Sequence, residues 1–381
     1  MKEIEEEKFS LKDALFNAEK VAYLSDLVHN AYYNFDENAF RHEVMAKFPK
    51  LELKERIYWI GDCLEKYLPK NYEALLHILV QTLPEELDPE NTDDDFGDFI
   101  FSPLAYLVAK KGQNSRDLPA SLEALGEMTK RFSVEYSIRY FLNSFPKETF
   151  AKMMEWSQSE NYHQRRLASE GLRPTLPWGI GLDDYKIENS AKILDNLYAD
   201  KARFVTRSVA NHLNDISKFD PEFVLKTLKK WKKSEKQEKE EMDFLIRHSL
   251  RTLVKKGDRA SLDFLGFKEN PEIKILDFKI KRTKIKIGEK LIFSFRLQSE
   301  SEVPENLMID YIIRYANARN KLSEKVFKIK QLELRAGGHK IIEKKHLLKK
   351  MSTRNLYTGK HTVYLQINGK IMAKEEFHLK V

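Results

Sequence analysis

The sequence predicts an α-solenoid of helical repeats followed by an all-β sandwich. Apolar residues recur with the period of a helix up to about residue 256, whereas apolar and polar residues alternate after residue 267. At 381 residues, two domains fit the chain better than a single core. The predicted domains are residues 1–267, which are helical, and residues 268–381, which form the sandwich.

The helical domain begins with two capped helices. Ser10 is a suitable N-cap for a helix over residues 9–29, and Asp36 is a suitable N-cap for a second helix that ends near Phe48. Further helices are predicted at residues 52–67, 71–83, 100–111, 119–131, 134–144 and 146–157, and beyond a central stretch at 187–197, 201–217, 221–232 and 238–256. The acidic segment 84–98 interrupts the series and is predicted to be a solvated loop.

The central stretch is Asn161–Trp178, NYHQRRLASEGLRPTLPW. It predicts a helix that ends at Gly171, because glycine readily takes a left-handed position there and the proline that follows cannot extend the helix. Arg166 and Glu170 are four residues apart, so both project from one face. Two prolines stiffen the next loop, which is expected to deliver Trp178 close to Glu170.

An arginine recurs early in the second helix of several predicted helical pairs. These residues are Arg139, Arg166, Arg207 and Arg247, and their spacings are 27, 41 and 40 residues. The last two spacings are typical of HEAT-like repeats. Stacked pairs of this kind form a curved solenoid whose second helices line a concave face, so we expect that face to be basic.

The C-terminal part carries the signals of a sheet. The segment 271–301 alternates with period two around a turn at Gly288, and further strands are predicted from LMIDYIIRYAN, KVFKIKQLEL, KKHLL, HTVYLQIN and KEEFHLKV. Gly337-Gly338 and Asn368-Gly369 indicate hairpins. About seven short strands predict an immunoglobulin-like β-sandwich. The linker is expected at about residues 266–271.

Composition narrows the class of protein. The chain is 33% charged with a mean hydropathy of −0.55, and it has no window of about 18 apolar residues, so no transmembrane helix is expected. The N-terminal MKEIEEEKFS lacks the apolar segment of a signal peptide. Cys63 is the only cysteine, which excludes an internal disulfide and a cysteine zinc cluster. We therefore expect a cytoplasmic protein.

Positive charge increases along the chain. The net charge is −11 for residues 1–130, +5 for residues 131–271 and +13 for residues 272–381. A polyanion such as DNA should therefore be attracted to the middle and C-terminal parts. The candidate DNA-binding residues are Arg139, Arg165, Arg166, Arg173, Arg207, Asn211, His212, Lys218, Arg247 and Arg251.

Three carboxylates fall among these arginines. Glu135 lies four residues before Arg139, Glu170 lies four residues after Arg166, and Asp215 continues the same register. Carboxylates repel a DNA backbone, so their presence needs a reason. One reason is the stabilisation of a cationic sugar in a glycosidic transition state, or the orientation of a water molecule. The alternative is that they pair with the arginines and order the repeat.

Trp178 likewise has a structural and a functional interpretation. Most tryptophans pack in a core, but its place after a proline in a loop favours partial exposure. An exposed indole can lie over a cationic base or an electron-poor sugar. His163 and His212 have no paired metal-binding spacing and are expected to make polar contacts. Neither a metal nor a cofactor is expected, since the chain lacks GxxxxGK[ST], GxGxxG and HExxH motifs.

Three segments carry a family resemblance. RRLASEGLRPTLPWG at 165–179, RSVANHLNDISK at 207–218 and RFSVEYSIR at 131–139 resemble the AlkC branch of the AlkC/AlkD-type DNA alkylation repair glycosylases. These are HEAT-like proteins, and some AlkC members carry a C-terminal immunoglobulin-like domain. The resemblance covers nearly the whole chain. Thr175 departs from the motif, because the family usually has arginine there.

The resemblance implies a monofunctional DNA glycosylase that excises cationic N-alkylated bases, such as N3-methyladenine and 3-methylcytosine, without base flipping. Trp178 would lie against the deoxyribose of the lesion. Glu135, Glu170 and Asp215 would face the glycosidic bond as catalytic residues. Arg166 and Arg173 would hold the site or the DNA backbone. The expected partner is double-stranded DNA with alkylated bases, bound by a monomer that is not attached to a membrane.

A non-catalytic HEAT-type scaffold for nucleic acid or protein is the alternative. A scaffold that only binds phosphate should carry few acids on its binding face, whereas a protein-binding solenoid should expose an apolar or asparagine-rich groove. A bifunctional lyase or a nuclease would need a Schiff-base lysine or a metal cluster. The carboxylates together with Trp178 favour the glycosylase.

Overall fold

The computed structural model describes residues 10–93, 95–316, 323–349 and 356–380. The first nine residues, with the acidic N-terminal stretch and the first position of the first predicted helix, lie outside this range. The chain folds as two compact units. One comprises the residues up to 219 together with 227–249, and the other comprises residues 220–226 and the chain from residue 250 onward. The predicted division at residue 267 stays a prediction.

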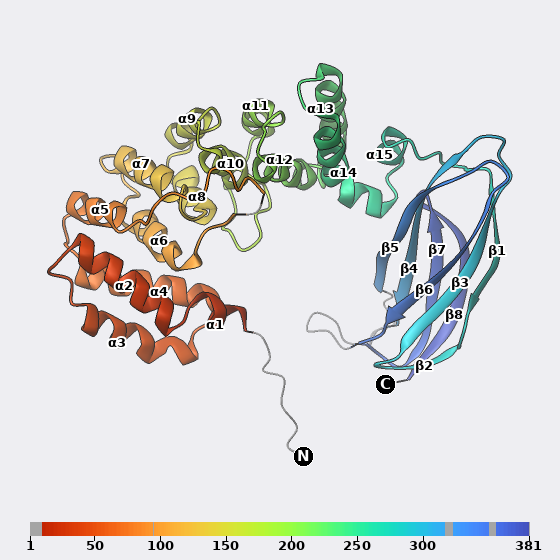
Figure 1. Ribbon diagram of the computed structural model, residues 1–381, viewed down its shortest axis with the longest axis horizontal. Helices are drawn as coiled ribbons and strands as arrows, with labels where there is room; N and C mark the ends of the chain where they lie inside the picture. The colour runs from red at the N-terminus through yellow and green to blue at the C-terminus, as the bar shows by residue number, and fades with distance from the viewer. Residues whose placement is uncertain (1–9, 94, 317–322, 350–355, 381) are drawn as a thin grey trace, which may run out of the picture. The chain divides into compact units, whose positions relative to one another are not determined.

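The helical part is a series of short helices in chain order (Figure 1). The α-helices are α1 (Leu11–Leu15), α2 (Ala18–Ala31), α3 (Glu37–Lys47), α4 (Leu53–Tyr67), α5 (Tyr72–Gln81), α6 (Ser102–Lys111), α7 (Leu118–Met128), α8 (Glu135–Ser144), α9 (Pro146–Trp156), α10 (Tyr162–Gly171), α11 (Ile187–Leu197), α12 (Arg203–Ile216), α13 (Pro221–Ser234), α14 (Lys239–Lys256) and α15 (Arg259–Phe264). Two 3₁₀ turns, η1 (Phe48–Lys50) and η2 (Phe99–Phe101), accompany them.

Several helical boundaries differ from the prediction. The first helix is in fact two, because the side chain of Asn17 accepts a hydrogen bond from the backbone of Lys20 and starts α2 anew. The short helix α15 lies in a stretch that was not predicted to be helical. Gly171 is the last residue of α10 and does not have a positive φ, so the expected left-handed position is wrong. Its role is steric and is described below.

The β-sandwich consists of two facing sheets. Its strands are β1 (Ile273–Ile280), β2 (Lys284–Lys286), β3 (Lys290–Ser299), β4 (Glu305–Tyr315), β5 (Ser323–Leu334), β6 (His339–Leu347), β7 (Gly359–Ile367) and β8 (Lys370–Lys380). One sheet has the order β1-β3-β6 and the other β2-β8-β7-β4-β5. All pairings are antiparallel except that of β2 with β8. The structure therefore describes eight strands where about seven were predicted.

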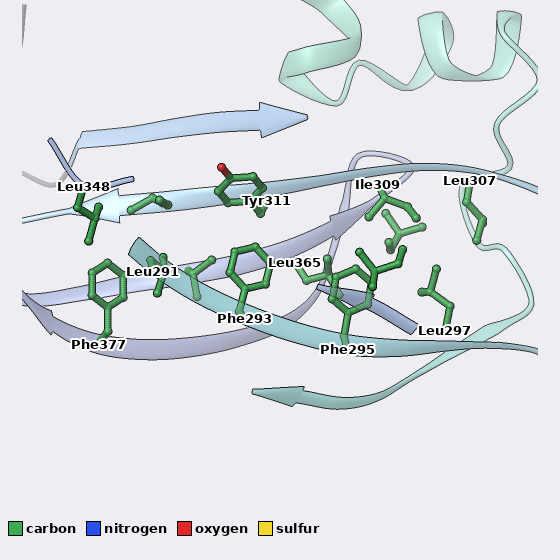
Figure 2. Close-up of a cluster of buried hydrophobic side chains, with 14 of the residues drawn as sticks. Leu291, Phe293, Phe295, Leu297, Leu307, Ile309, Tyr311, Leu348, Leu365 and Phe377 are labelled. Carbon is green, nitrogen blue, oxygen red and sulfur yellow. The ribbon is translucent and has the colours of Figure 1, made fainter. Parts of the chain in front are cut away.

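The core of the sandwich is aromatic and aliphatic. Phe293 and Phe295 alternate with polar residues along β3, so they point to the same side and are buried. Figure 2 shows them packing with Tyr311, Leu365 and Phe377 from the opposite sheet. The predicted order of a helical region followed by a sandwich is confirmed.

Candidate active site

The central helix α10 packs against both α8 and α12, and these are second helices of the predicted pairs. Close approach is possible because α10 ends in Gly171. A Cβ there would lie 2.7 Å from Ile138 Cγ2 and 3.0 Å from Met153 Cε. This packing brings three segments that are distant in sequence to the walls of one cleft.

The cleft has a volume of about 250 Å³. It is lined by Phe96, Glu135, Tyr136, Arg166, Glu170, Arg173, Leu176, Pro177, Phe204, Arg207, Ser208 and Asn211. The lining of the cleft therefore includes two of the three predicted carboxylates and four of the predicted DNA-binding residues. They come from α8, α10, α12 and the loop after α10.

Glu135 stands at the start of α8 beside an arginine from α10. Its carboxylate Oε2 lies 3.5 Å from Arg166 Nη1, and the hydroxyl of Ser133 donates to the same oxygen. Arg166 in turn donates to the Ser133 hydroxyl. Both charged side chains are buried. Glu135 is thus held through Oε2 by one ion pair and one hydroxyl.

Glu170 is the most enclosed carboxylate of the cleft. Arg173 Nη1 donates to its Oε1 at 2.6 Å, and the Ser208 hydroxyl donates to its Oε2 at 2.6 Å. Burial opposes its ionisation, but Arg166, Arg173 and the hydrogen bonds from Ser208 and Arg173 outweigh burial and lower the pKa of Glu170. The carboxylate is therefore ionised at neutral pH.

Asp215 lies behind Arg173 and is not a lining residue of the cleft. Arg173 Nε donates to Asp215 Oδ2 at 2.8 Å, and its Nη2 forms an ion pair with the same oxygen at 2.8 Å. Lys218 Nζ donates to Oδ1 at 2.7 Å. Arg173 thereby joins Asp215 to Glu170 across α10 and α12. Burial works against the charge of Arg173, but the two carboxylates outweigh it and raise its pKa.

Two aromatic rings that sequence reasoning missed enclose Arg166. Its guanidinium carbon lies 4.3 Å from the ring centroid of Phe204 and 5.1 Å from that of Phe96. Stacking on aromatic faces is a common arrangement for arginine. Phe96 comes from the acidic segment that was predicted to be only a solvated loop. The one available signal was Phe96 itself, the only aromatic residue in the acidic segment 84–98.

Trp178 projects from a tight turn beside the cleft. The Gly179 N–H donates to the Leu176 carbonyl at 3.2 Å, with Pro177 and Trp178 as the central residues. Leu176 is buried, whereas Trp178 is 56% exposed, as the sequence led us to expect. Pro177 lines the cleft, and Trp178 lines an adjoining apolar cavity of about 60 Å³ together with Tyr136. Tyr136 lines both spaces.

Two predicted DNA-binding residues are fully buried. Arg139 has no exposed surface and donates to backbone carbonyls of the loop that carries Trp178. His212 Nδ1 lies 3.0 Å from the Ser169 carbonyl, which can only accept, so Nδ1 carries the proton. Burial, with Arg173 nearby, lowers the pKa of His212 to about 3. The phosphate contacts expected of these two residues conflict with their burial, and both instead support their neighbours.

The remaining predicted DNA contacts occupy several places. Arg207 lines the cleft and pairs with Asp93. Arg165 does not line it, because its guanidinium pairs with Asp200, 3.0 Å from Nη2 to Oδ1. Asn211 Oδ1 lies 2.9 Å from His248 Nε2. Lys218, Arg247 and Arg251 are exposed, and the last two lie on α14.

The described residues contain no group of three or more histidine, cysteine, aspartate or glutamate side chains that could hold a metal ion. In the same part of the chain, no helix is long and apolar enough to cross a membrane. Cys63 is buried, and burial raises the pKa of its thiol to about 12, so it is not a thiolate at neutral pH.

The chemical character of the cleft follows from these contacts. Two carboxylates held by ion pairs and hydroxyl groups line the cleft, and the indole of Trp178 lines the adjoining cavity. Such a site can stabilise a positive charge that develops on a bound molecule, and it can hold a water molecule by a carboxylate oxygen.

Two protein families match this chain. Residues 104–253 match a family described as "DNA alkylation repair enzyme", and residues 274–381 match the C-terminal Ig-like domain of the uncharacterised protein YhaZ. The second match confirms the immunoglobulin-like character of the sandwich. The first covers the helices that build the cleft.

The chain is also similar to two whole proteins. It is 32% identical to the uncharacterised protein YhaZ of Bacillus subtilis over 371 residues, which is 96% of this chain and 98% of the relative. It matches the structure of Pseudomonas fluorescens alkylpurine DNA glycosylase AlkC bound to DNA containing an abasic site analog. That match has a TM-score of 0.88 and 33% identity, and it covers 98% of this chain and 100% of the other.

Proposed function

The chain belongs to the family of DNA alkylation repair proteins that includes YhaZ and AlkC, and from this premise we propose that it is a DNA glycosylase. Its substrates would be duplexes with cationic N-alkylated bases, principally N3-methyladenine and 3-methylcytosine. The reaction is hydrolysis of the N-glycosidic bond, which leaves an abasic site. The observation that carries the proposal is the cleft lined by Glu135 and the ionised Glu170, next to a turn that carries the exposed Trp178.

The chemistry of the substrate explains why such a cleft suffices. A base with a positive charge is already a good leaving group, so no general acid is required to protonate it. The sugar gains positive charge as the bond breaks, and a fixed carboxylate nearby lowers the energy of that transition state. Glu135 and Glu170 would take this role, and a carboxylate oxygen would orient the attacking water.

The three catalytic carboxylates then take different parts. Glu135 and Glu170 line the cleft, whereas Asp215 acts on it through Arg173, which it shares with Glu170. We therefore propose that Glu135 and Glu170 face the sugar and that Asp215 fixes Arg173. Trp178 would lie against the deoxyribose of the lesion.

Recognition of DNA is proposed to be mainly electrostatic. Arg207, Lys218, Arg247 and Arg251 would contact phosphates, and Arg166, Arg173 and Asn211 would contact the backbone or shape the site. A cleft of about 250 Å³ with partly exposed walls suits a lesion that stays in the DNA stack, so we propose excision without base flipping. We also propose a monomer that acts in the cytoplasm on double-stranded DNA.

The test is release of free base from a duplex that contains a single 3-methylcytosine or N3-methyladenine. Free base is measured by mass spectrometry and abasic sites by alkaline strand cleavage. Removing an electrostatic group of this kind commonly costs about 100-fold or more in rate, so Glu170→Gln should lose excision to that extent. Glu148→Gln, an exposed change on α9, is the matched control and should resemble the wild type.

Binding is measured on the same duplex by fluorescence anisotropy, and folding by circular dichroism. Loss of excision by a folded Glu170→Gln protein that still binds DNA supports the glycosylase. Absence of base release by the wild type, with salt-dependent DNA binding intact, would instead favour the non-catalytic scaffold.

A further inference from the structure

Three side chains on one face of α8 reach the same loop. Tyr136, Arg139 and Asn143 are spaced three and four residues apart, which places them on one side of the helix. Each donates a hydrogen bond to a backbone carbonyl of the loop that follows α10. Trp178 belongs to that loop, so the face of α8 and the exposed indole are physically connected.

Arg139 holds the start and the end of the loop together. Its Nη1 donates to the carbonyls of Gly171 at 2.9 Å and Arg173 at 2.8 Å, and its Nε donates to the carbonyl of Ile180 at 2.6 Å. Burial lowers the pKa of Arg139 to about 10, with Arg173 adding to the effect. This buried cation therefore donates to three backbone carbonyls through Nε and Nη1.

The other two side chains fix points on either side of Trp178. The Tyr136 hydroxyl donates to the Pro177 carbonyl at 3.3 Å. The Asn143 amide donates to the Gly181 carbonyl at 3.0 Å and accepts from the Asp183 N–H at 3.2 Å. Hydrogen bonds from α8 therefore hold the loop on both sides of Trp178.

The backbone at Trp178 explains why such fastening is needed. Trp178 has a φ of 69°, in the left-handed region that bulky residues rarely adopt. It is the third residue of a turn with proline in the second place, and turns of this kind normally have glycine or asparagine there. A fourth residue, Lys54 of α4, donates to the Trp178 carbonyl. A tryptophan held at a glycine position is a strained arrangement that the surrounding contacts must impose.

We propose that Tyr136, Arg139 and Asn143, with Lys54, are positioning residues that hold Trp178 in its strained turn so that its indole is presented to DNA in one orientation. The inference rests on the proposed function for its purpose, because an indole that lies against the lesion's sugar must be in place before the DNA arrives. The restraint of Trp178 itself does not depend on whether the protein has glycosylase activity. None of these four residues needs to touch DNA.

The experiment uses the full-length protein labelled with 5-fluorotryptophan and observed by fluorine NMR. The chain has four tryptophans, and Trp178→Phe identifies the resonance of Trp178. The test variants are Asn143→Ala, which removes two hydrogen bonds to the loop, and Tyr136→Phe, which removes one. These bonds lie at the exposed edge of α8, so both variants should fold. Ser144→Ala is the matched control, because Ser144 is next on the same helix but bonds Gln113 and not the loop.

We expect the Trp178 resonance to shift or split in both test variants while the other three resonances stay in place. Base excision under single-turnover conditions should fall about tenfold, with the Kd for DNA changed less than threefold. Ser144→Ala should change neither the spectrum nor the rate.

Two results would overturn the inference. One is a Trp178 resonance that is unchanged in both variants, and the other is a changed resonance with unchanged excision. If the wild type releases no base at all, the proposed function fails. The restraint of Trp178 is then decided by the fluorine spectrum alone, so the two failures are distinguishable.

Discussion

Arg173 illustrates how single residues in this protein serve two purposes. Its guanidinium is buried, so it could not remain there without partners, and it finds them in Glu170 and Asp215. The same contacts hold Glu170 ionised, which a buried carboxylate would otherwise resist. The ion pairs are therefore consistent with both readings of the sequence, because they order the repeat and also prepare a negative charge for chemistry.

A second residue-scale feature gives a stability prediction. Alanine at position 178 would keep the unfavourable left-handed backbone, whereas glycine adopts it freely. Trp178→Gly should therefore be more stable than Trp178→Ala by about 1 kcal/mol, although both variants should lose excision. Urea unfolding of the two proteins measures the difference.

Thr175 provides the control for that comparison. It is an exposed neighbour in the same loop without a positive φ, so Thr175→Gly should be less stable than Thr175→Ala. If glycine is the less stable replacement at both positions, the turn does not impose the strain that we assign to Trp178.

At the scale of elements, the close packing of α10 against α8 sets the geometry of the cleft. Gly171 ends α10 directly against Ile138 of α8 and Met153 of α9. The absence of a side chain there lets the carboxylate at the end of α10 approach the one at the start of α8. A change in this spacing should be transmitted to the cleft.

The corresponding prediction concerns Gly171→Ala. The added methyl would clash with Ile138 and Met153, and overpacking of this kind costs about 1–3 kcal/mol. Gly181→Ala is the matched control, since no atom lies within 4 Å of the Cβ that it would add. Thermal unfolding should show a lower Tm for Gly171→Ala only, and equal Tm values for the two variants would contradict the packing argument.

The elements themselves were largely predictable, and several of the site contacts were not. Apolar periodicity located most helices, and the spacing of Glu170 from Arg166 placed both on one face as found. The apolar periodicity does not predict that Arg139 is buried. An arginine on a helix face is expected to be exposed, and its burial depends on the loop that covers it. Phe96 was missed for a similar reason: its partner Arg166 is 70 positions away in the sequence, and only tertiary structure brings them together.

At the scale of the whole molecule, buried histidines couple stability to pH. Burial lowers the pKa of His163 and His346 to about 4, and that of His212 to about 3. Each is neutral in the folded protein at pH values where the unfolded chain, with a pKa of about 6.5, binds a proton. Stability is therefore complete above pH 6.5 and falls as the pH drops below it.

The prediction is a loss of about 1.4 kcal/mol per pH unit for each such histidine between about pH 6 and 4. Urea unfolding at pH 7.5, 5.5 and 4.5 measures the slope. His163→Phe should make the slope shallower by about one proton, because His163 packs among aromatic rings and its Nε2 has no hydrogen-bond partner in the described structure. An unchanged slope in that variant would show that His163 does not contribute.

The contact between Arg207 and Asp93 has a consequence for how the protein would search a genome. A DNA phosphate that approaches Arg207 has to displace a carboxylate that already holds it, so each phosphate contact exchanges one ion pair for another. The net gain in binding free energy on undamaged DNA would be smaller than for an arginine without a carboxylate partner, which would shorten the dwell time on each non-target site. The acidic segment that carries Asp93 would thus lower the affinity for undamaged DNA and increase the rate at which the protein moves between sites.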